Sequence, residues 1–300
     1  MKYIFIVNPY SGKSELKEDL FEKLEKYKDK IEYEVKNFSK KEETINFIDE
    51  YCSGCKEDVV FIAVGGDGTI NTVVSGAVNH KNAIVTCYPC GSGNDFVKIY
   101  GGKEKFLNLD NLLNGEEIKI DVMKVNDMYS VNVTNFGFEA AVCDVANNVR
   151  RKKIIGGKRS YTTGIIVSIF KSMKTKCKIV ADNEVVAEKS VLLGGLANGK
   201  YVGGAYMCAP YSNNEDGLLE VCVVKPISIF RFASLIGKYK AGKHLDEPKL
   251  RKFINYKRAK RVVIDADDNF KMCLDGEIYT GSHFEIENMK QVLRFIKPKE

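Results

Sequence analysis

The stretch Val59–Val64 followed by Gly65-Gly66-Asp67-Gly68-Thr69 is the most informative part of this sequence. Six apolar residues in succession are typical of a strand that is buried in a parallel sheet. The glycines allow the backbone to approach a phosphate closely, and a helix that begins at Thr69 offers free N–H groups and the positive end of its dipole. Asp67 adds a carboxylate to this loop. The stretch therefore predicts an α/β protein with a phosphate-binding loop at the end of a buried strand.

Strands and helices alternate in the same way through residues 1–124, for which we predict a nucleotide-binding α/β domain. The predicted strands are Tyr3–Val7, Tyr33–Val35, Val59–Val64 and Ala83–Cys87. Between them, apolar residues recur at helical spacing from Ser14, after a capping box of Ser39 and Glu42, over Thr69–Asn79, and over Phe106–Leu113. Repeated βα units predict a parallel, doubly wound sheet.

The pattern changes over residues 125–300 to that of a β-rich second domain. Runs rich in Val, Ile, Tyr and Phe alternate with polar turns, and they predict strands at Lys176–Ala181, Ser190–Leu196, Leu218–Val224, Arg261–Ala266, Phe270–Leu274 and Gln291–Ile296. Helices are predicted near Glu139–Val149, Gly164–Met173 and Ser228–Lys240. We therefore predict an α/β protein in which a doubly wound domain is followed by a β-sandwich-like domain, with the boundary at residues 124 and 125.

Two further glycine-bearing loops follow predicted strands. They are Asn8-Pro9-Tyr10-Ser11-Gly12-Lys13 and Cys90-Gly91-Ser92-Gly93-Asn94-Asp95. In an open α/β sheet, such loops meet in one crevice at the carboxyl ends of the strands. The chain has no GxxxxGK[ST] motif, neither loop completes a GxGxxG fingerprint, and the HRD and DFG motifs of protein kinases are missing. These absences disfavour a P-loop enzyme, a dinucleotide-binding dehydrogenase and a protein kinase.

The three loops resemble, in order and spacing, the signature of the diacylglycerol kinase-like lipid kinases, most closely the bacterial soluble ones. The motifs are Asn8-Pro9-x-Ser11-Gly12, Gly65–Thr69 and Gly91–Phe96, and the resemblance continues through Asp121-Val122, Asn135–Phe138, Asp216–Leu219 and Leu274–Glu277. Sphingosine and ceramide kinases are more distant relatives. NAD kinases and phosphofructokinases share the GGDG element but not the other two motifs.

This resemblance implies an enzyme that transfers the γ-phosphoryl group of ATP to a lipid hydroxyl, first of all that of diacylglycerol, to give phosphatidic acid. The second domain would then hold the lipid substrate. The residues that the resemblance places around ATP are Asn8, Pro9, Tyr10, Ser11, Gly12, Ser39, Gly65, Gly66, Asp67, Gly68, Thr69, Ile70, Asn71 and Ser92. Ser39 and Ser92 stand where threonine is commoner, and both keep the hydroxyl group.

The resemblance also implies the catalytic and metal-binding residues. Glu277 matches the family's proton acceptor, and a structural Mg²⁺ would be held by the Asp216 side chain with backbone carbonyls near Asn213 and Leu218. Asp67 would lie near Mg²⁺–ATP, because hard cations prefer oxygen ligands. The sequence leaves open whether Glu277 or Asp67 is the general base.

Ordinary structural roles compete with these assignments. Glu277 follows Asp275-Gly276, a common hairpin dipeptide, and Asp67 could be the N-cap of the helix that follows it. Ser39 could serve only its capping box, and Asp216 only its turn. Asp95 and Asp121 could extend a carboxylate network or act as turn residues, and Lys13 could meet a phosphate or only water.

Composition and cysteine content narrow the class of protein. The 300 residues are 44% hydrophobic and 29% charged, which is typical of a globular protein. Nine cysteines, including the pairs Cys52–Cys55 and Cys87–Cys90, fit reduced thiols better than disulfides, zinc or redox chemistry. No apolar run approaches the ~18 residues of a membrane span, and the N-terminus lacks the features of a secretory signal. We therefore expect a cytoplasmic protein.

The net charge of +6 is concentrated in residues 150–178 and 231–261. In the first stretch, Arg150–Lys153, Lys158 and Arg159 precede an apolar helical face that includes Ile165 and Phe170. Such a pattern predicts peripheral contact with an anionic membrane, although an ordinary helix with solvated lysines fits it nearly as well. We expect no nucleic-acid partner, because no motif for one is present. The oligomeric state stays open, with a homodimer among the alternatives.

Two other functions remain compatible with the sequence. The chain could phosphorylate another lipid alcohol, or it could be a catalytically silent protein that binds nucleotide or lipid on the same fold. The presence of both Asp67 and Glu277 argues against the silent alternative. A nucleic-acid binder that uses the basic stretches would show tight duplex binding with a steep dependence on salt.

Overall fold

Four parallel strands form the centre of the N-terminal lobe in the computed structural model, which describes residues 1–10, 12–151 and 174–299. They are β1 (Lys2–Val7), β2 (Glu32–Asn37), β3 (Val59–Gly65) and β4 (Ala83–Pro89), in the order β2-β1-β3-β4. Every residue of β3 and β4 is buried. The continuous apolar sequence of these strands is therefore explained by a position in the middle of the sheet.

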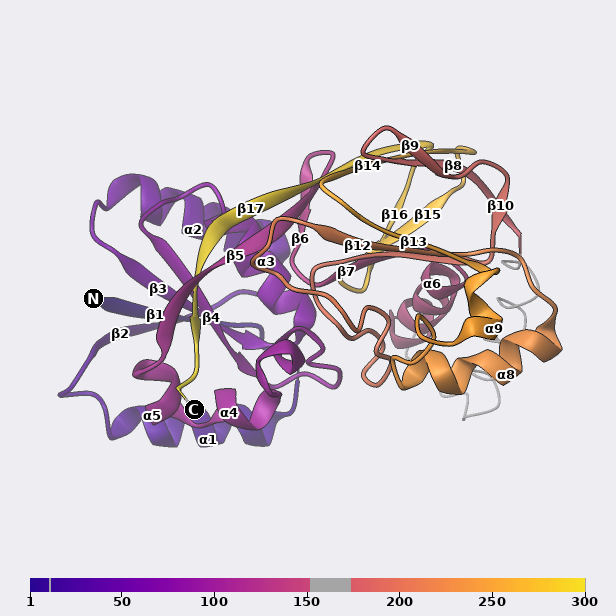
Figure 1. The fold of residues 1–300 in the computed structure, drawn as a ribbon. Coiled ribbons are helices and arrows are strands. Elements are labelled where there is room, and N and C mark those ends of the chain that lie inside the picture. Colours follow the sequence, from indigo (N-terminus) through magenta and orange to yellow (C-terminus); the bar gives the residue numbers. More distant parts are fainter. Residues whose placement is uncertain (11, 152–173, 300) are drawn as a thin grey trace.

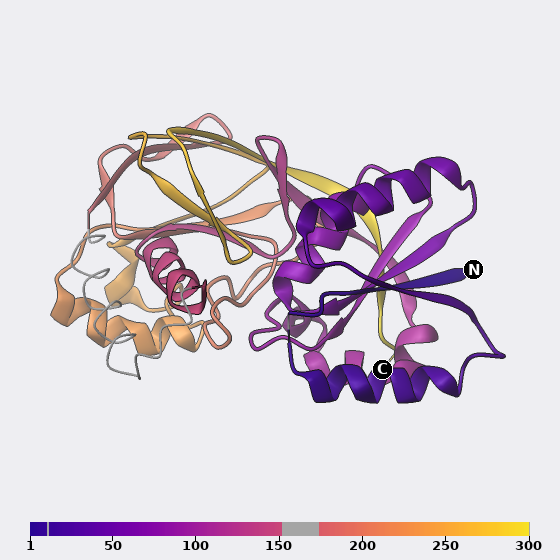
Figure 2. The ribbon, with the colours of Figure 1, turned by 180° about the vertical axis from the view of Figure 1, so that it is seen from behind.

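Helices cover both faces of this sheet (Figures 1 and 2). One face carries α2 (Lys41–Gly54) and α3 (Asp67–Ala77), and the other carries α1 (Ser14–Glu25), α4 (Lys103–Leu107) and α5 (Leu109–Leu113). A short 3-10 helix, η1 (Phe96–Tyr100), follows the third glycine loop. The predicted doubly wound α/β architecture of the N-terminal lobe is confirmed.

The last strand, β17 (His283–Lys297), runs from one lobe into the other (Figure 1). Its first half pairs with β14 (Arg261–Ala266), and its second half pairs in parallel with β4, with Phe295 opposite Val85. Along most of its length it also pairs with β5 (Glu116–Val125), across an irregularity between Met289 and Leu293. One sheet therefore extends through both lobes.

The second lobe is a sandwich of two sheets. The extended sheet contributes β14, β8 (Thr175–Ala181), β9 (Glu184–Ala187), β10 (Ser190–Val191) and β6 (Met128–Ser130) beside β5 and β17. The other sheet has the order β13-β12-β11-β7-β15-β16, with the bounds Ile254–Ala259, Leu219–Val224, Leu193–Ala197, Val133–Gly137, Lys271–Leu274 and Glu277–Thr280. Between the sheets, the rings of Phe136, Phe270 and Phe284 pack in series.

Three helices lie on the outer face of the six-stranded sheet (Figure 1). They are α6 (Phe138–Arg151), α8 (Ile229–Lys240) and α9 (Pro248–Arg251). The predicted β-sandwich-like second domain is confirmed, and α6 and α8 begin within one residue of the predicted helices. The helix predicted over Gly164–Met173 lies outside the described residues. The division at residues 124 and 125 stays a prediction; these residues are the last two of β5.

Two local predictions are wrong. The capping box of Ser39 and Glu42 does not form, because Lys40 is the N-cap residue of α2 and no side chain caps this helix. The helix predicted over Phe106–Leu113 is broken at Asn108, whose side-chain oxygen accepts the N–H of Asn111 and so begins α5 as a separate helix. In both places, the N-cap residue of the helix is a polar residue that the sequence analysis did not single out, Lys40 for α2 and Asn108 for α5.

Candidate active site

The first and third glycine loops contact each other at Gly12 and Cys90. Gly12 has a positive φ of 80°, and a Cβ atom there would lie 2.5 Å from the carbonyl oxygen of Cys90. The next residue, Lys13, donates its N–H to the same oxygen at 3.0 Å. Glycine is therefore required at position 12 both for its backbone conformation and for the close approach of the two loops.

The second and third loops meet at Gly66 and Gly91. A Cβ atom on Gly91 would lie 2.5 Å from Gly66 Cα, and the carbonyl oxygen of Gly65 accepts the N–H groups of Cys90 and Gly91 at 2.8 and 3.2 Å. The three loops therefore meet at one edge of the sheet, as the sequence predicts. Their packing of backbone against backbone leaves no room for side chains between them.

Lys17 in α1 binds the backbone of the first loop. Its Nζ donates to the carbonyl oxygens of Asn8 and Pro9 at 2.8 and 3.1 Å, and the residue is only 9% exposed. The N–H of Tyr10 is held by Asn8 Oδ1 at 3.0 Å, while the Tyr10 ring is exposed. Ser11 lies outside the described residues. Sequence reasoning missed Lys17, because it is one of two lysines in a charged helix and no local pattern distinguishes it.

Asp67 is the first residue of α3 and does not cap it. The N-cap position belongs to Gly66, and Asp67 Oδ1 instead accepts the N–H of Phe96 at 3.1 Å. A Cβ atom on Gly93 would lie 3.1 Å from Asp67 Oδ2 and 3.5 Å from Asp95 Oδ2, so the two carboxylates flank Gly93. Burial and the charge of Asp95 raise the pKa of Asp67. A cation at this position would relieve the repulsion.

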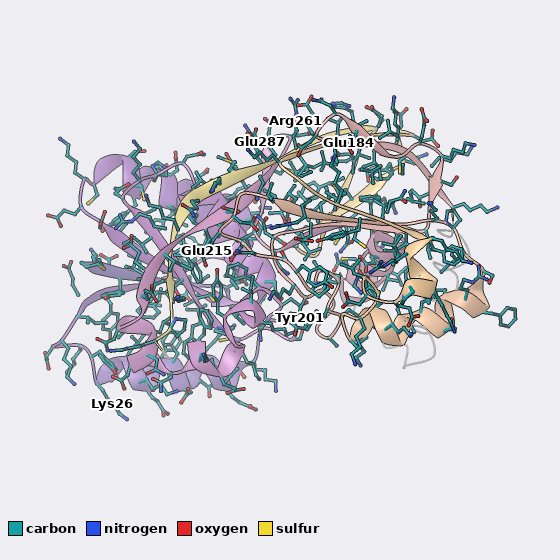
Figure 3. The ribbon with its side chains drawn as sticks, viewed as in Figure 1. Lys26, Glu184, Tyr201, Glu215, Arg261 and Glu287 are labelled. Atoms are coloured by element: carbon teal, nitrogen blue, oxygen red, sulfur yellow. The ribbon has the colours of Figure 1, made fainter. Side chains whose placement is uncertain are left out.

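Asp95 connects the third loop to the second lobe. Its carboxylate pairs with Lys98 and accepts the N–H of Gly204 at 2.9 Å, and Lys98 donates to the Gly204 carbonyl oxygen at 2.7 Å. Lys98 Nζ also lies 5.4 Å from the centre of the Tyr201 ring, which is found between the lobes in Figure 3. Asp95 is therefore a residue of the interface between the lobes and not only a turn residue.

Asn71 and Asp275 make a second connection between the lobes. Asn71 Nδ2 donates to Asp275 Oδ2 at 3.0 Å, and the same carboxylate accepts the N–H groups of Val131, Asn132 and Val133 at 2.7, 3.1 and 2.9 Å. Burial raises the pKa of Asp275 to about 6 despite these hydrogen bonds. The predicted ATP residue Asn71 thus has its side-chain amide bound to the second lobe.

Asp275 and Gly276 form the turn that precedes Glu277. Both have positive φ, 46° and 96°, which is the backbone conformation of a type I′ hairpin turn. The four hydrogen bonds to the Asp275 carboxylate fix the turn between β15 and β16, and Glu277 follows it as the first residue of β16. The turn and Glu277 contact α3 through Asn71 and α2 through Lys41. The hairpin role and a catalytic role for this segment are therefore compatible.

Glu277 is held by a lysine of the first lobe and a tyrosine of its own strand. Lys41 Nζ and the Tyr279 hydroxyl both donate to Glu277 Oε2, at 3.0 and 2.8 Å, and Lys41 also donates to the Tyr279 oxygen at 3.1 Å. Burial lowers the pKa of Lys41, but the charge of Glu277 and the hydrogen bonds outweigh it, so that this pKa is raised. Glu277 itself is 45% exposed and so is open to a substrate.

Two family models match this chain. Residues 2–125 match the diacylglycerol kinase catalytic domain, and residues 132–297 match the YegS C-terminal NAD kinase beta sandwich-like domain. The chain belongs to the diacylglycerol kinase-like family of lipid kinases. It is therefore a phosphotransferase with an alcohol acceptor, and the predicted family is confirmed.

Relatives resemble this lipid kinase over nearly its whole length. The diacylglycerol kinase of Bacillus subtilis (strain 168) is 28% identical over 98% of this chain and 96% of its own. That of Staphylococcus carnosus (strain TM300) is 26% identical, with 98% and 94% covered. The crystal structure of a diacylglycerol kinase from Bacillus anthracis str. Sterne matches with a TM-score of 0.71 and 22% identity, over 98% and 96% of the two chains. The match to that structure confirms the fold.

The remaining predicted ATP residues of this lipid kinase differ in accessibility. Ser39, Gly68 and Ser92 are exposed near the loops, whereas Thr69 and Ile70 are buried at the start of α3. The N–H groups of Thr69 and Ile70 are bound to the Gly66 carbonyl oxygen. The Ile70 side chain is fully buried, and the assignment of these residues to the nucleotide site stays a prediction.

The predicted metal loop of the kinase is tied to its surroundings by hydrogen bonds. Asp216 Oδ1 accepts the N–H of Leu218 at 2.9 Å, and Oδ2 pairs with Arg258, whose Nε lies 3.0 Å from Glu220 Oε1. Arg258 would therefore have to move away from Asp216 Oδ2 before this oxygen could bind a Mg²⁺ ion. In residues 1–10, 12–151 and 174–299, no three Asp, Glu, His or Cys side chains form a metal-binding group. The roles of Asn213, Asp216 and Leu218 stay predictions.

Asp121 holds the other side of this loop in the kinase. Its fully buried carboxylate accepts the N–H groups of Gly217 and Gln291 at 2.6 and 2.7 Å, and the Asn288 amide at 3.1 Å. It therefore fixes the irregularity of β17 against the loop that precedes β12. The residue belongs to a structural network that is separate from Asp67 and Asp95.

The described part of the kinase contains no helix that is long and apolar enough to cross a membrane. Of the basic stretch predicted to contact a membrane, residues 152–173 lie outside the described residues. Its membrane role stays a prediction. The second basic stretch, residues 231–261, is described throughout.

Proposed function

We propose that this lipid kinase transfers the γ-phosphoryl group of ATP to the hydroxyl group of diacylglycerol, with Mg²⁺ bound to the nucleotide. The observation that carries this proposal is the position of Glu277. Its carboxylate is half-exposed, comes from the substrate lobe, and is held by Lys41 of the nucleotide lobe. The names of the relatives in Bacillus and Staphylococcus support diacylglycerol as the acceptor.

The three loops supply a site of suitable chemistry for the nucleotide. The N-terminus of α3, next to Gly66 and Gly68, directs the positive end of a helix dipole toward a bound anion. Lys17 binds the carbonyl oxygens of Asn8 and Pro9 and so fixes the backbone of the first loop. The hydroxyl groups of Ser39 and Ser92 are exposed beside the loops. We therefore assign the predicted ATP residues to this edge of the sheet.

Two buried or half-buried carboxylates suit a divalent cation. Asp67 and Asp95 flank Gly93, and burial together with the charge of Asp95 raises the pKa of Asp67. Mg²⁺ held with the ATP phosphates would neutralise negative charge on the transferred group. Asp67 Oδ2 is the oxygen that remains for this contact, because Oδ1 accepts the N–H of Phe96. We assign Asp67 to metal and phosphate positioning.

Glu277 is the proton acceptor in this proposal. The lipid hydroxyl attacks the γ-phosphorus, the bond from that phosphorus to the β–γ bridging oxygen breaks, and the hydroxyl proton passes to the Glu277 carboxylate. ADP is the leaving group. Lys41 and Tyr279 both bind Oε2, so Oε1 is the oxygen without one of these contacts and is the one available to the substrate.

The decisive experiment is incubation of the purified chain with Mg²⁺ and labelled ATP in mixed micelles that contain one lipid alcohol at a time. We expect transfer to diacylglycerol, with phosphatidic acid as the product. Transfer only to a long-chain base or another alcohol would mean that this alcohol, and not diacylglycerol, is the substrate. The absence of transfer to any lipid would favour a catalytically silent binding protein. Glu287→Gln is a matched control for Glu277→Gln, since Glu287 is a glutamate on β17 far from the loops (Figure 3).

A further inference from the structure

Phe230 is the most exposed large apolar side chain among the described residues, at 87%. It stands at the start of α8, whose inner residues Phe232 and Leu235 pack on the second lobe beside Phe138 and Phe253. A phenyl ring in water is unfavourable, and α8 has apolar residues available for its inner face without it. The packing of α8 on the second lobe therefore does not use Phe230, and the ring is accessible to a binding partner.

Three cations lie together around Phe253, and one of them, Arg231, is the chain neighbour of Phe230. The Arg231 guanidinium lies 4.6 Å from the centre of the Phe253 ring, and Lys252 Nζ lies 5.2 Å from the same centre. Lys225 Nζ donates to the carbonyl oxygen of Lys252 at 3.4 Å. All three residues are exposed, and none of them forms an ion pair with a carboxylate of the described residues. We call Lys225, Phe230, Arg231, Lys252 and Phe253 the α8 patch.

The segment that contains the α8 patch is depleted of acidic residues. Residues 225–264 contain twelve lysines and arginines against Asp246 and Glu247. Both acids are already bound: Asp246 accepts the hydroxyl of Tyr211, and Glu247 pairs with Lys238. Four of the twelve cations are also paired, since Lys238, Lys257, Arg258 and Arg261 contact carboxylates. Lys225, Arg231 and Lys252 therefore supply the positive charge next to an exposed aromatic ring, a combination that binds at the surface of an anionic bilayer.

We infer that the α8 patch docks this kinase on an anionic membrane. Phe230 enters the boundary between head groups and acyl chains, and Lys225, Arg231 and Lys252 contact lipid phosphates. The inference rests on the proposed function, since a substrate that stays in the bilayer requires the enzyme to reach it. Charge complementarity favours an anionic lipid surface over an apolar protein partner.

A series of contacts through α8 and α6 also connects the α8 patch with the turn before Glu277, the proposed proton acceptor. Phe232 of α8 packs edge-on against Phe138 at the start of α6, with ring centres 5.0 Å apart. From the same α6, Asn147 Nδ2 and Cys143 Sγ contact the carbonyl oxygen of Gly276, at 2.8 and 3.1 Å, directly before Glu277. Two helices on one face of the six-stranded sheet therefore connect the patch with the turn that holds the proton acceptor (Figure 1).

Vesicle sedimentation tests the docking directly. The probes are vesicles of phosphatidylcholine alone and of phosphatidylcholine with phosphatidylglycerol, without nucleotide. We expect the wild-type chain to bind only the anionic vesicles, with binding that weakens as salt rises. Lys225→Gln/Arg231→Gln/Lys252→Gln should reduce this binding about 10²-fold. Phe230→Ser should reduce it about tenfold, because the ring no longer enters the interface.

Matched variants on the nucleotide lobe provide the controls. Lys26→Gln/Lys28→Gln/Lys30→Gln removes three surface cations, and Phe21→Ser removes another exposed phenyl ring. Neither should change vesicle binding, and the patch variants should keep wild-type turnover of a soluble short-chain diacylglycerol. Equal losses in control and patch variants, or binding that is indifferent to lipid charge, would overturn the inference.

Two further outcomes separate this inference from the proposed function. If the wild-type chain binds duplex DNA but no vesicle, and the triple variant loses that binding, the patch serves nucleic acid and the inference is wrong. If vesicle binding and its loss occur as expected but no lipid is phosphorylated, the docking surface stands and the proposed function fails.

Discussion

Lys41 Nζ lies 3.0 Å from Glu277 Oε2, and the two residues belong to different lobes. Lys41 is the first residue of α2 and Glu277 the first of β16, so each is held at the start of a regular element. The ion pair orients the Glu277 carboxylate. The proposed proton acceptor is thereby positioned by the lobe that is proposed to carry the nucleotide.

Glu277→Gln should reduce kcat by about 10²–10⁴-fold, the usual cost of losing a general base. The amide keeps the shape and can still accept from Tyr279, so the thermal midpoint and nucleotide affinity should stay close to those of the wild type. Turnover on mixed micelles under saturating ATP measures the effect. A variant with wild-type turnover, in conditions where the chemical step limits the rate, would remove Glu277 from the mechanism.

Lys41→Met should lower turnover on mixed micelles, because Glu277 loses the cation that lies 3.0 Å from its Oε2 and so loses part of its fixed orientation. Lys41→Arg keeps the charge and should restore part of the turnover. The affinity for nucleotide should stay close to that of the wild type in both variants. Wild-type turnover of Lys41→Met would mean that Lys41 contributes only to the contact between the lobes.

Asp67→Asn should abolish activity and raise the free energy of unfolding at neutral pH. Burial and Asp95 raise the pKa of Asp67, so the folded state disfavours its charge, and an amide removes that cost while still accepting the N–H of Phe96. Chemical denaturation at pH 7.5 and a kinase assay measure the two effects. Lower stability together with full activity would contradict the proposed role.

Glu139→Gln should flatten the dependence of stability on pH. Burial raises the pKa of Glu139 to about 7, although its hydrogen bond from Tyr239 at 2.6 Å acts in the opposite direction. A carboxyl whose pKa is raised in the folded state lowers stability as pH rises from about 4.5 to 7, here by up to roughly 3 kcal/mol. Denaturation curves at pH 5 and 8 test this, with Glu287→Gln as the control. Equal slopes for variant and wild type would exclude Glu139 as the source.

Arg258→Gln should strengthen Mg²⁺ binding in the absence of nucleotide. Arg258 pairs with Asp216 Oδ2, so its removal frees the carboxylate that is predicted to hold a structural metal. Titration calorimetry should give a tighter site in this variant than in the wild type and no site in Asp216→Ala/Arg258→Gln. Identical Mg²⁺ binding in all three chains would place any metal elsewhere.

The sequence predicted the nucleotide lobe better than the contacts that complete it. Helical and strand periodicity are local signals, so β3, β4 and α3 were visible from the residues themselves. The parallel pairing of Phe295 with Val85 joins positions more than two hundred residues apart, and no local pattern reports it. The same holds for β5, whose burial is decided by β17.

The residues of the candidate site also differ in how well the sequence predicts them. Glycines and acids in rare combinations, such as Gly66-Asp67-Gly68, carry a signal that sequence reasoning can use. Lys17 and Lys41 are lysines in charged helices of a lysine-rich chain, and no local pattern distinguishes them until the fold shows their partners. Asp275 was visible as part of a motif, but its role in fixing Val131–Val133 needed the structure.

The return of β17 to the first lobe has a consequence for the order of synthesis. Leu293, Phe295 and Ile296 are part of the core of the nucleotide lobe, although the whole second lobe precedes them in the chain. Until β17 has been synthesised, β4 presents an unpaired edge to solvent, which is the kind of surface that pairs with other chains. Folding of the nascent nucleotide lobe therefore stays incomplete until the second lobe has also been synthesised, and loss of β17 would destabilise the lobe that was made first.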